Sequence, residues 1–297
     1  KSKMTAYFSL IGLALAFGSL AVQWWYMASS LPFDGFYGMV RIDGFALLFK
    51  AIFLIAAALA IGISTRYLDI EGEQHGEYYA LVLFATVGMM FLACGYDLIS
   101  LYISLELMAL TFYVLVAFTK REKRSNEAAM KYFLLGAFSS GVLLYGMSLL
   151  FGIAGSTNLG EIGSKINQLV PEVQNAIFAN AQPGAVPNPV SGLRPMMLLA
   201  MIALGAGLFF KVAAVPFHMW APDVYEGAPT SVTAFLSTGS KAASFALYAR
   251  IFSEALGGMR ADWAPLLGLV AAITIMVGNW AAVTQENSKR LLAYSSI

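Results

Sequence analysis

The stretch LLAMIALGAGLFFKVAAVPFHMW, residues 198–220, has the length of a membrane-spanning helix and contains two residues that such a helix rarely holds. A helix needs about 20 apolar residues to cross the roughly 30 Å hydrocarbon core of a bilayer. Lys211 lies in the middle of the stretch, where an ionised side chain costs about 2.5 to 3.5 kcal/mol. Pro216 has no amide hydrogen and its ring clashes with the carbonyl of Val212, so the helix should kink or open there. We therefore expect a membrane helix that is broken beside a buried charge.

The rest of the chain has the same character. Of its 297 residues, 59% are hydrophobic and 12% are charged, against about a quarter charged in soluble domains. Apolar runs long enough to span a bilayer occur at 4–27, 44–64, 78–94, 97–118, 127–154, 196–220, 229–252 and 264–283. The chain begins KSK and ends LLAYSSI, which indicates a fragment cut inside a further helix. The sequence predicts an all-α polytopic membrane protein with about eight transmembrane helices and a truncated ninth.

Composition also excludes several classes of function. The net charge is +1, and the basic segment KREKR at 120–124 is short and typical of a membrane anchor, so we expect no nucleic-acid partner. Cys94 is the lone cysteine, which excludes an internal disulfide and an iron-sulfur cluster held by this chain alone. No metal-binding or nucleotide-binding motif is present, and we expect neither a metal site nor a cofactor on this chain.

Loop charges predict how the chain crosses the membrane. If the amino terminus is cytoplasmic, nine basic residues fall in inner segments and four in outer ones, and the positive-inside rule favours this orientation. The outer segment at 155–195 contains apolar residues at helical spacing and is expected to form an amphipathic pair of helices on the membrane surface. Pro171 is expected to open the second helix, and a proline-rich linker follows it.

Two further charges match Lys211 in depth. Glu106 and Lys241 lie in the runs 97–118 and 229–252, and the rise of 1.5 Å per residue puts all three about 14 to 18 Å from the inner ends of their runs. Charges at this depth are rare and usually functional, although a buried structural ion pair is the alternative. The three residues are predicted to form a row along the membrane plane.

Other charged residues within the runs have less certain roles. Arg250 and Lys50 lie near enough to run ends for their side chains to reach the membrane surface. For Lys131, a side chain that reaches the membrane surface and a functional charge inside the membrane are equally compatible with its position. His218 follows Lys211 by seven residues on the same helical face and could shuttle protons, although an interfacial structural role is the alternative.

A stripe of polar residues surrounds Lys241. Its members recur at spacings of three and four residues and are Thr230, Thr233, Ser237, Lys241, Ser244 and Tyr248. Such a stripe either holds water beside the lysine or joins helices through hydroxyl groups. A lysine releases its proton when a carboxylate partner moves away, which is the elementary step of a proton pump.

Four segments resemble a known family. They are VPFHMWAPDVYEGAPTSVTAFLSTGSKAA at 215–243, SLELMALTFYVLVAF at 104–118, SNEAAMKYFLLGAFSSG at 125–141 and NSKRLLAYSSI at 287–297. Together they resemble the antiporter-like subunits of bacterial NADH-quinone oxidoreductase, respiratory complex I, and above all its subunit N family. The resemblance covers essentially the whole chain.

The resemblance implies a domain organisation and a set of site residues. Peripheral helices would occupy 1–77, a first five-helix repeat 78–255, and the start of a second, inverted repeat 256–297. Glu106, Lys211, Lys241 and Lys131 would belong to a charged axis for proton transfer, with the broken helix carrying Lys211. His218 would connect this axis to cytoplasmic water.

The resemblance further implies a multi-pass subunit of a translocase in the bacterial inner membrane. Its partners would be other membrane-arm subunits, lipid and protons, while NADH, FMN, iron-sulfur clusters and quinone would be bound by other subunits of the respiratory-chain complex. Quinone reduction there would drive proton movement through the Glu/Lys relay. One alternative is a subunit of a multisubunit cation/proton antiporter, and another is a membrane scaffold whose buried charges only fix helix register.

Overall fold

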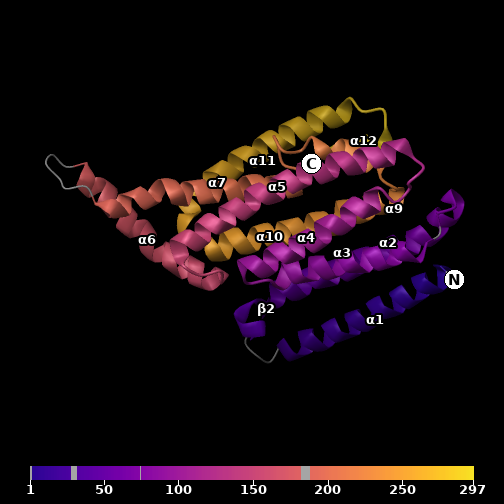
Figure 1. Ribbon diagram of the computed structural model, residues 1–297, viewed down its shortest axis with the longest axis horizontal. Coiled ribbons are helices and arrows are strands. Elements are labelled where there is room, and N and C mark those ends of the chain that lie inside the picture. Colours follow the sequence, from indigo (N-terminus) through magenta and orange to yellow (C-terminus); the bar gives the residue numbers. More distant parts are fainter. Residues whose placement is uncertain (1, 28–31, 74, 182–187) are drawn as a thin grey trace.

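The chain, seen in a computed structural model that describes residues 2–27, 32–73, 75–181 and 188–297, is built almost entirely from helices that run roughly side by side (Figure 1). Seven helical stretches in the described residues are long and apolar enough to cross a membrane. The long helices are α1 (Ser2–Met27), α2 (Gly44–Glu71), α3 (Gly76–Cys94), α4 (Leu98–Val116), α5 (Lys123–Ala154), α6 (Leu159–Asn180), α7 (Leu193–Val212) and α11 (Arg260–Val283). The remaining elements are short: β1 (Phe33–Gly35), η1 (Phe36–Gly38), β2 (Val40–Ile42), η2 (Pro189–Gly192), α8 (Trp220–Gly227), α9 (Thr230–Phe235), η3 (Leu236–Ser240), α10 (Lys241–Arg250), η4 (Ile251–Ala255), η5 (Gly257–Met259) and α12 (Ser288–Ser296).

The expected run at 229–252 is present but is not a uniform α-helix. It is formed by α9 and α10, with π-helical turns at η3 between them and at η4 after α10. A π turn inserts an extra residue and rotates all side chains that follow, and such turns are frequent at functional sites. Lys241 comes directly after the first of these turns. The predicted all-α fold with about eight spanning helices is confirmed, and α12 occupies the place of the short ninth.

One end of the bundle is closed by a small β-hairpin that the sequence did not predict. Strands β1 and β2 pair antiparallel with Phe33 opposite Ile42. Single bridges then join Val40 to Gly95 and Asp97 to Asn158. Helices α2, α4 and α6 all begin at this end, and their caps Asp43, Asp97 and Asn158 accept hydrogen bonds from backbone amides. We call it the hairpin end, and the opposite end, which holds residues 120–124, the basic end.

The predicted break beside Lys211 is confirmed. Helix α7 ends at Val212, and Ala213 adopts a left-handed conformation with φ of 59°. The chain resumes as helix only at Trp220, whose indole donates a hydrogen bond of 2.9 Å to the carbonyl of Phe210. His218 consequently lies in the connecting turn. The expectation that His218 shares a helical face with Lys211 was wrong, because no continuous helix joins the two residues.

Helix α6 corrects another expectation. Residues 159–180 form one helix that contains Pro171, and not a pair of helices with Pro171 at the start of the second. The buried face of α6 continues on both sides of the proline, through Leu169 and Val173. We attribute the continuity to the packing of this face, since the proline removes only one backbone hydrogen bond. Residues 182–187 of the predicted proline-rich linker lie outside the described residues.

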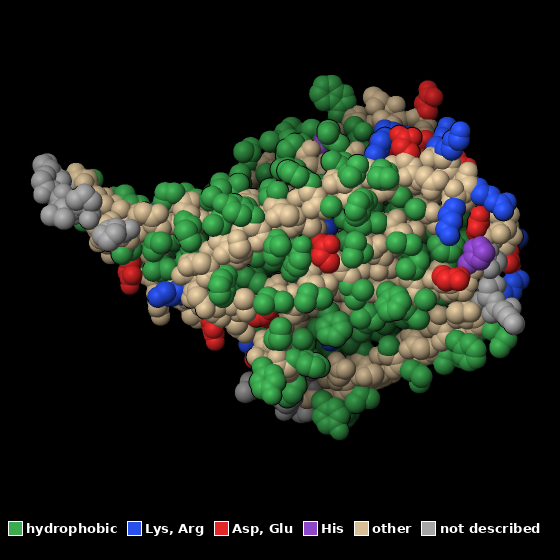
Figure 2. Space-filling model, viewed as in Figure 1, with side chains coloured by type: hydrophobic (Ala, Val, Ile, Leu, Met, Phe, Trp, Pro, Cys, Tyr) green, Lys and Arg blue, Asp and Glu red, His purple; other side chains and the backbone are tan. Residues whose placement is uncertain are grey.

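The side chains divide the molecule into bands. Figure 2 shows charged side chains gathered at the right-hand end of the bundle and apolar side chains across its middle. Helix α6 lies across the opposite end, at the left of Figure 1. This distribution fits a protein whose middle band faces lipid, and the chain is a multi-pass membrane protein.

Candidate functional site

Close packing of α5 against α7 holds Lys211 at the centre of the bundle. A Cβ atom added to Gly207 would lie 2.7 Å from the Cβ of Leu143, so the two helices touch along small residues. Lys211 lies one turn further along α7 and is 5% exposed. Its Nζ donates a hydrogen bond of 3.3 Å to the Oγ of Ser140, a residue near the middle of α5. The broken end of α7 therefore lies at mid-bundle.

Lys241 meets the same break from the other side. It is 7% exposed, and its Nζ donates hydrogen bonds to the carbonyl of Val212 at 2.9 Å and to that of Ser296 at 2.6 Å. Val212 is the last residue of α7, and the end of a helix carries unpaired carbonyls and a partial negative charge that favour a cation. Lys241 thus binds the backbone of the residue next to Lys211, and the two lysines lie at one break.

Glu106 lies at the middle of α4 and is half-buried. Its Oε1 atom is buried and has no hydrogen-bond partner among the described residues. Glu106 is close enough to Lys211 for an electrostatic interaction. We call Glu106, Lys211 and Lys241 the mid-bundle row.

In the described part of the chain, no member of the row forms an ion pair within 4.0 Å. The alternative of a closed structural ion pair is therefore not what this structure contains. A buried lysine bonded only to neutral oxygens is able to lose a proton without leaving a bare carboxylate behind. This arrangement suits proton exchange better than permanent charge storage.

The structure does not bring Lys131 to the row. Its side chain is 45% exposed at the basic end, and Nζ lies 2.9 Å from both Glu127 Oε1 and Asp223 Oδ2. Arg290 binds the other oxygen of Asp223, also at 2.9 Å. Burial opposes ionisation of Asp223, but the hydrogen bonds from Lys131 and Arg290 outweigh it and lower the pKa of this carboxyl. Lys131 thus belongs to a surface cluster of alternating charges.

The remaining candidates, His218 and the polar stripe, are not joined to the row by any side-chain hydrogen bond among the described residues. His218 is partly buried in the connecting turn, and its Nδ1 has no partner there. The predicted stripe is divided by η3, so that Thr230 is exposed while Lys241 and Ser244 are buried. Ser244 donates to the carbonyl of Ser240 on its own helix at 2.8 Å. The hydroxyl groups mostly satisfy their own backbone, whereas the Tyr248 hydroxyl is buried without a partner among the described residues.

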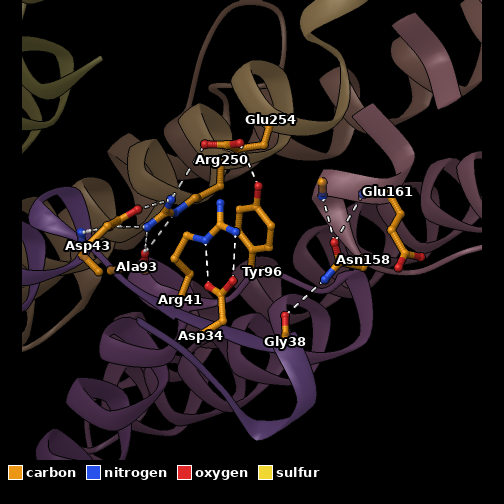
Figure 3. A network of polar contacts seen from close by, with 12 residues as sticks. Asp34, Gly38, Arg41, Asp43, Ala93, Tyr96, Asn158, Glu161, Arg250 and Glu254 are labelled. Carbon is orange, nitrogen blue, oxygen red and sulfur yellow. Dashed lines mark hydrogen bonds and ion pairs between the residues drawn. The ribbon is translucent and has the colours of Figure 1, made fainter. Parts of the chain in front are cut away.

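The Arg250 side chain was expected to reach the membrane surface, but it is buried and paired with a carboxylate. Figure 3 shows its guanidinium directed at Asp43, and both Nη atoms lie 2.7 Å from the two carboxylate oxygens. The side chain is 4% exposed and also donates to the carbonyl of Ala93. The tertiary structure supplies this pair with its partner, so the side chain has no need to reach water. Lys50 is likewise buried and lies against Cys94.

More charges extend this network at the hairpin end (Figure 3). Arg41 binds Asp34 through two hydrogen bonds of 2.8 and 3.0 Å, and its guanidinium lies 3.6 Å from the ring centroid of Tyr96. Tyr96 donates to Glu254 at 2.9 Å. We call Asp34, Arg41, Asp43, Tyr96, Arg250 and Glu254 the hairpin-end network.

Sequence reasoning missed several residues of the site. Ser140, the partner of Lys211, had no signal beyond its place in an apolar helix, because a serine there usually bonds its own backbone. The Ser296 carbonyl is a backbone group and leaves no mark in the sequence. In the described residues, no three His, Cys, Asp or Glu side chains lie close enough to hold a metal ion.

Comparison with known proteins matches this arrangement to one group. The family model described as NADH:quinone oxidoreductase/Mrp antiporter, TM, matches residues 95–297. NADH-quinone oxidoreductase subunit N 2 of Solibacter usitatus (strain Ellin6076) is 53% identical over 296 residues, which is 98% of this chain and 56% of that protein. The chain thus spans about half the length of the curated relatives it matches.

Solved structures show the same fold. A chain from respiratory complex I of Thermus thermophilus, solved with bound Aureothin, is 35% identical and superposes with a TM-score of 0.75 over 99% of this chain and 56% of that one. A chain of the Mrp complex from Dietzia sp. DQ12-45-1b superposes with a TM-score of 0.76 over 100% of this chain and 52% of that one. The latter is 21% identical and shows the fold alone.

Proposed function

This chain belongs to the NADH:quinone oxidoreductase/Mrp antiporter transmembrane family, and from this premise we propose that it serves proton translocation in the membrane arm of an NADH-quinone oxidoreductase. The supporting relatives are named as subunit N of that enzyme, and the 35% identical structure comes from respiratory complex I. The redox work, with NADH, FMN, iron-sulfur clusters and quinone, belongs to other subunits of the complex. The bacterial inner membrane is the proposed location.

One observation carries the proposal. Two lysines buried to at least nine-tenths meet at the break in α7, and their hydrogen bonds within the described residues reach only neutral oxygens. Carrying such charges in a membrane without fixed counter-ions is costly, and a purely structural role would favour closed pairs like that of Arg250 and Asp43. Proton transfer through Lys211 and Lys241 accounts for their presence, with Glu106 as the charge that modulates them.

Replacing Lys241 in the intact complex tests the proposal. We expect Lys241→Ala to assemble normally but to translocate several-fold fewer protons per quinone reduced. Lys165→Ala is the matched control, because Lys165 is exposed on α6 far along the chain from the row. The proposal fails if a fully assembled Lys241→Ala complex pumps and turns over like the wild type.

The ion that is transported distinguishes the proposed function from that of a cation/proton antiporter. The likeness to the Mrp complex supports only the shared fold at 21% identity. If the chain served a sodium antiporter, ion movement would depend on sodium and would not follow quinone reduction. A scaffold would instead lose assembly in Lys241→Ala and show no defect in the complexes that do assemble.

A further inference from the structure

A pocket at the basic end reaches the last turn of α4. Its volume is about 690 Å³, and it lies where the start of α3 meets the last turn of α4 and the first turns of α5. Most of its lining is apolar, as at Val114 and Phe133, and its charged members are Glu73, Glu77 and Lys120. The charged members would hold water at the basic end of the pocket.

Tyr113 lines this pocket, and its hydroxyl group lies against Gly136 without a hydrogen-bond partner among the described residues. The side chain is only 7% exposed and its hydroxyl is buried. The ring is held edge-on by Tyr132 and Phe133, at centroid distances of 4.7 and 5.6 Å. A buried hydroxyl that lacks a protein partner indicates an ordered water or another group that it serves.

A glycine on the neighbouring helix makes room for this hydroxyl. A Cβ atom added to Gly136 of α5 would lie 2.0 Å from the hydroxyl oxygen of Tyr113, far inside van der Waals contact. Any side chain at position 136 would force the Tyr113 ring to move. The position of the hydroxyl group is therefore fixed by the packing of α4 against α5.

Glu106 lies directly along the same helix. Seven residues separate it from Tyr113, which is two turns, so both side chains share one face of α4 at a rise of about 10.5 Å. The buried Oε1 atom of Glu106 also lacks a partner within the described residues. About three waters at the usual hydrogen-bond spacing of roughly 2.8 Å would join the two oxygens. Two unpartnered oxygens and a pocket thus lie in sequence from the basic end to mid-bundle.

From these contacts we propose that Tyr113 and the pocket beside it form a proton-uptake path from the basic end to Glu106. A protonated water, supplied from the aqueous phase at the basic end, gives its excess proton to the Tyr113 hydroxyl and becomes neutral water, while that hydroxyl gives its own proton to the next water, which passes one on toward Glu106. The phenol is neutral before and after, and the proton arrives on the Glu106 carboxylate. Gly136 is a positioning residue for this step. The inference rests on the proposed function of the mid-bundle row.

Matched variants in the intact complex test the path. Tyr113→Phe removes the hydroxyl and keeps the ring, and Gly136→Ala displaces the ring. We expect both to slow coupled proton uptake at least five-fold and to raise its solvent deuterium isotope effect, which a merely structural change would not do. The controls are Tyr145→Phe, an exposed tyrosine of α5, and Gly141→Ala, where an added Cβ meets nothing within 4 Å.

Labelling tests the water in the pocket independently of turnover. Val114→Cys in the pocket should react with a charged, membrane-impermeant thiosulfonate from the basic end only. Leu134→Cys is also more than half exposed but does not line the pocket, and it should react at least ten-fold more slowly. The native Cys94 is buried and gives little background. Reaction of Val114→Cys with apolar maleimides alone would mean that lipid fills the pocket and would overturn the path.

Glu106→Gln distinguishes a failure of the uptake path from a failure of the proposed function. If it abolishes pumping while assembled Tyr113→Phe and Gly136→Ala pump normally, the uptake path is wrong and the proposed function stands. If Glu106→Gln pumps normally as well, the proposed function of the row fails. If Tyr113→Phe or Gly136→Ala does not assemble, the labelling of Val114→Cys decides the path.

Discussion

The hairpin-end network and the mid-bundle row differ in whether their buried cations are paired with a carboxylate. Arg250 has both oxygens of Asp43 within 2.7 Å, so its charge is compensated in place. Lys211 and Lys241 bond one hydroxyl group and two carbonyl groups, which stabilise a cation less than a carboxylate does. Both regions lie inside the same bundle, so burial alone does not distinguish them. The difference fits a structural role for the first region and the proton-exchange role that we propose for the second.

The largest expected effect breaks the compensated pair. Asp43→Asn keeps an oxygen that caps α2 through the Ala46 amide but removes the charge opposite Arg250. Removing one partner of a buried pair costs about 3 to 5 kcal/mol, and we expect the lower end because Asp43 is partly exposed. The amount of assembled complex in membranes and its melting temperature measure the loss. Wild-type stability in this variant would contradict the structural role of the network.

Replacing Lys211 of the mid-bundle row should leave stability unchanged or higher and reduce pumping. Lys211→Met replaces an uncompensated charge by an apolar side chain of similar length, so the melting temperature should stay the same or rise. Removing a proton-transfer group typically costs about 10²-fold to 10⁴-fold in rate, and pumping should fall by at least the lower figure. Measuring melting temperature and pumping on the same preparation checks both. A destabilised Lys211→Met complex would remove the contrast between the two regions.

Acid should weaken the pair of Asp43 and Arg250. Burial disfavours the Asp43 carboxylate, but hydrogen bonds from Arg250 and the Ala46 amide outweigh it, so the pKa of Asp43 is lowered from its ordinary value. The unfolded chain then binds more protons than the folded chain between the two pKa values, and stability rises with pH there. The stabilisation is complete above the ordinary value of about 3.9 and is lost as the pH falls through the lower, folded value.

Melting curves from pH 7 to pH 3 check this sign. Wild-type complex should lose stability below about pH 4 more steeply than Asp43→Asn, which has no carboxyl to protonate. Tyr145→Phe, at an exposed position, serves as a control that leaves the network intact. Equal slopes in wild type and Asp43→Asn would show that the pair does not contribute.

The smallest effect concerns the exposed pair of the same network. Asp34→Asn removes the partner of Arg41, whose two hydrogen bonds lie in contact with solvent. Exposed ion pairs contribute about 0.2 to 1 kcal/mol, and salt screens them. The shift in melting temperature should be small at low ionic strength and vanish at high salt. A shift as large as that of Asp43→Asn would mean that exposure does not set the strength of these pairs.

Much of the fold was predictable because its signals are local. Length and hydropathy predicted the helical runs, and Pro216 predicted the end of α7 at Val212. The same reasoning failed for Pro171, where a proline stays within a helix because the apolar face around it is buried on both sides. It also missed the β-hairpin, whose strands have three residues each and show too short a pattern to recognise.

The site was predictable only in part. Depth arithmetic selected Glu106, Lys211 and Lys241, and the structure brings the two lysines to one break. The arithmetic placed Arg250 near the end of its run, but it could not show that this side chain is as buried as the two lysines. Nor could it place Lys131, because its distance from Asp223 depends on how α5 packs against α8.

The sequence by itself determined which segments enter the membrane, where one helix breaks and which charges are carried inside. These properties follow from apolar length and from the covalent structure of proline, and neighbouring residues suffice to express them. Only the tertiary structure decided which partner each buried charge receives. Asp43 and Arg250 are 207 residues apart, and Lys241 meets a carbonyl 55 residues away. Helix packing and the π turn before Lys241 set these encounters, and they distinguish a compensated charge from one that is able to move a proton.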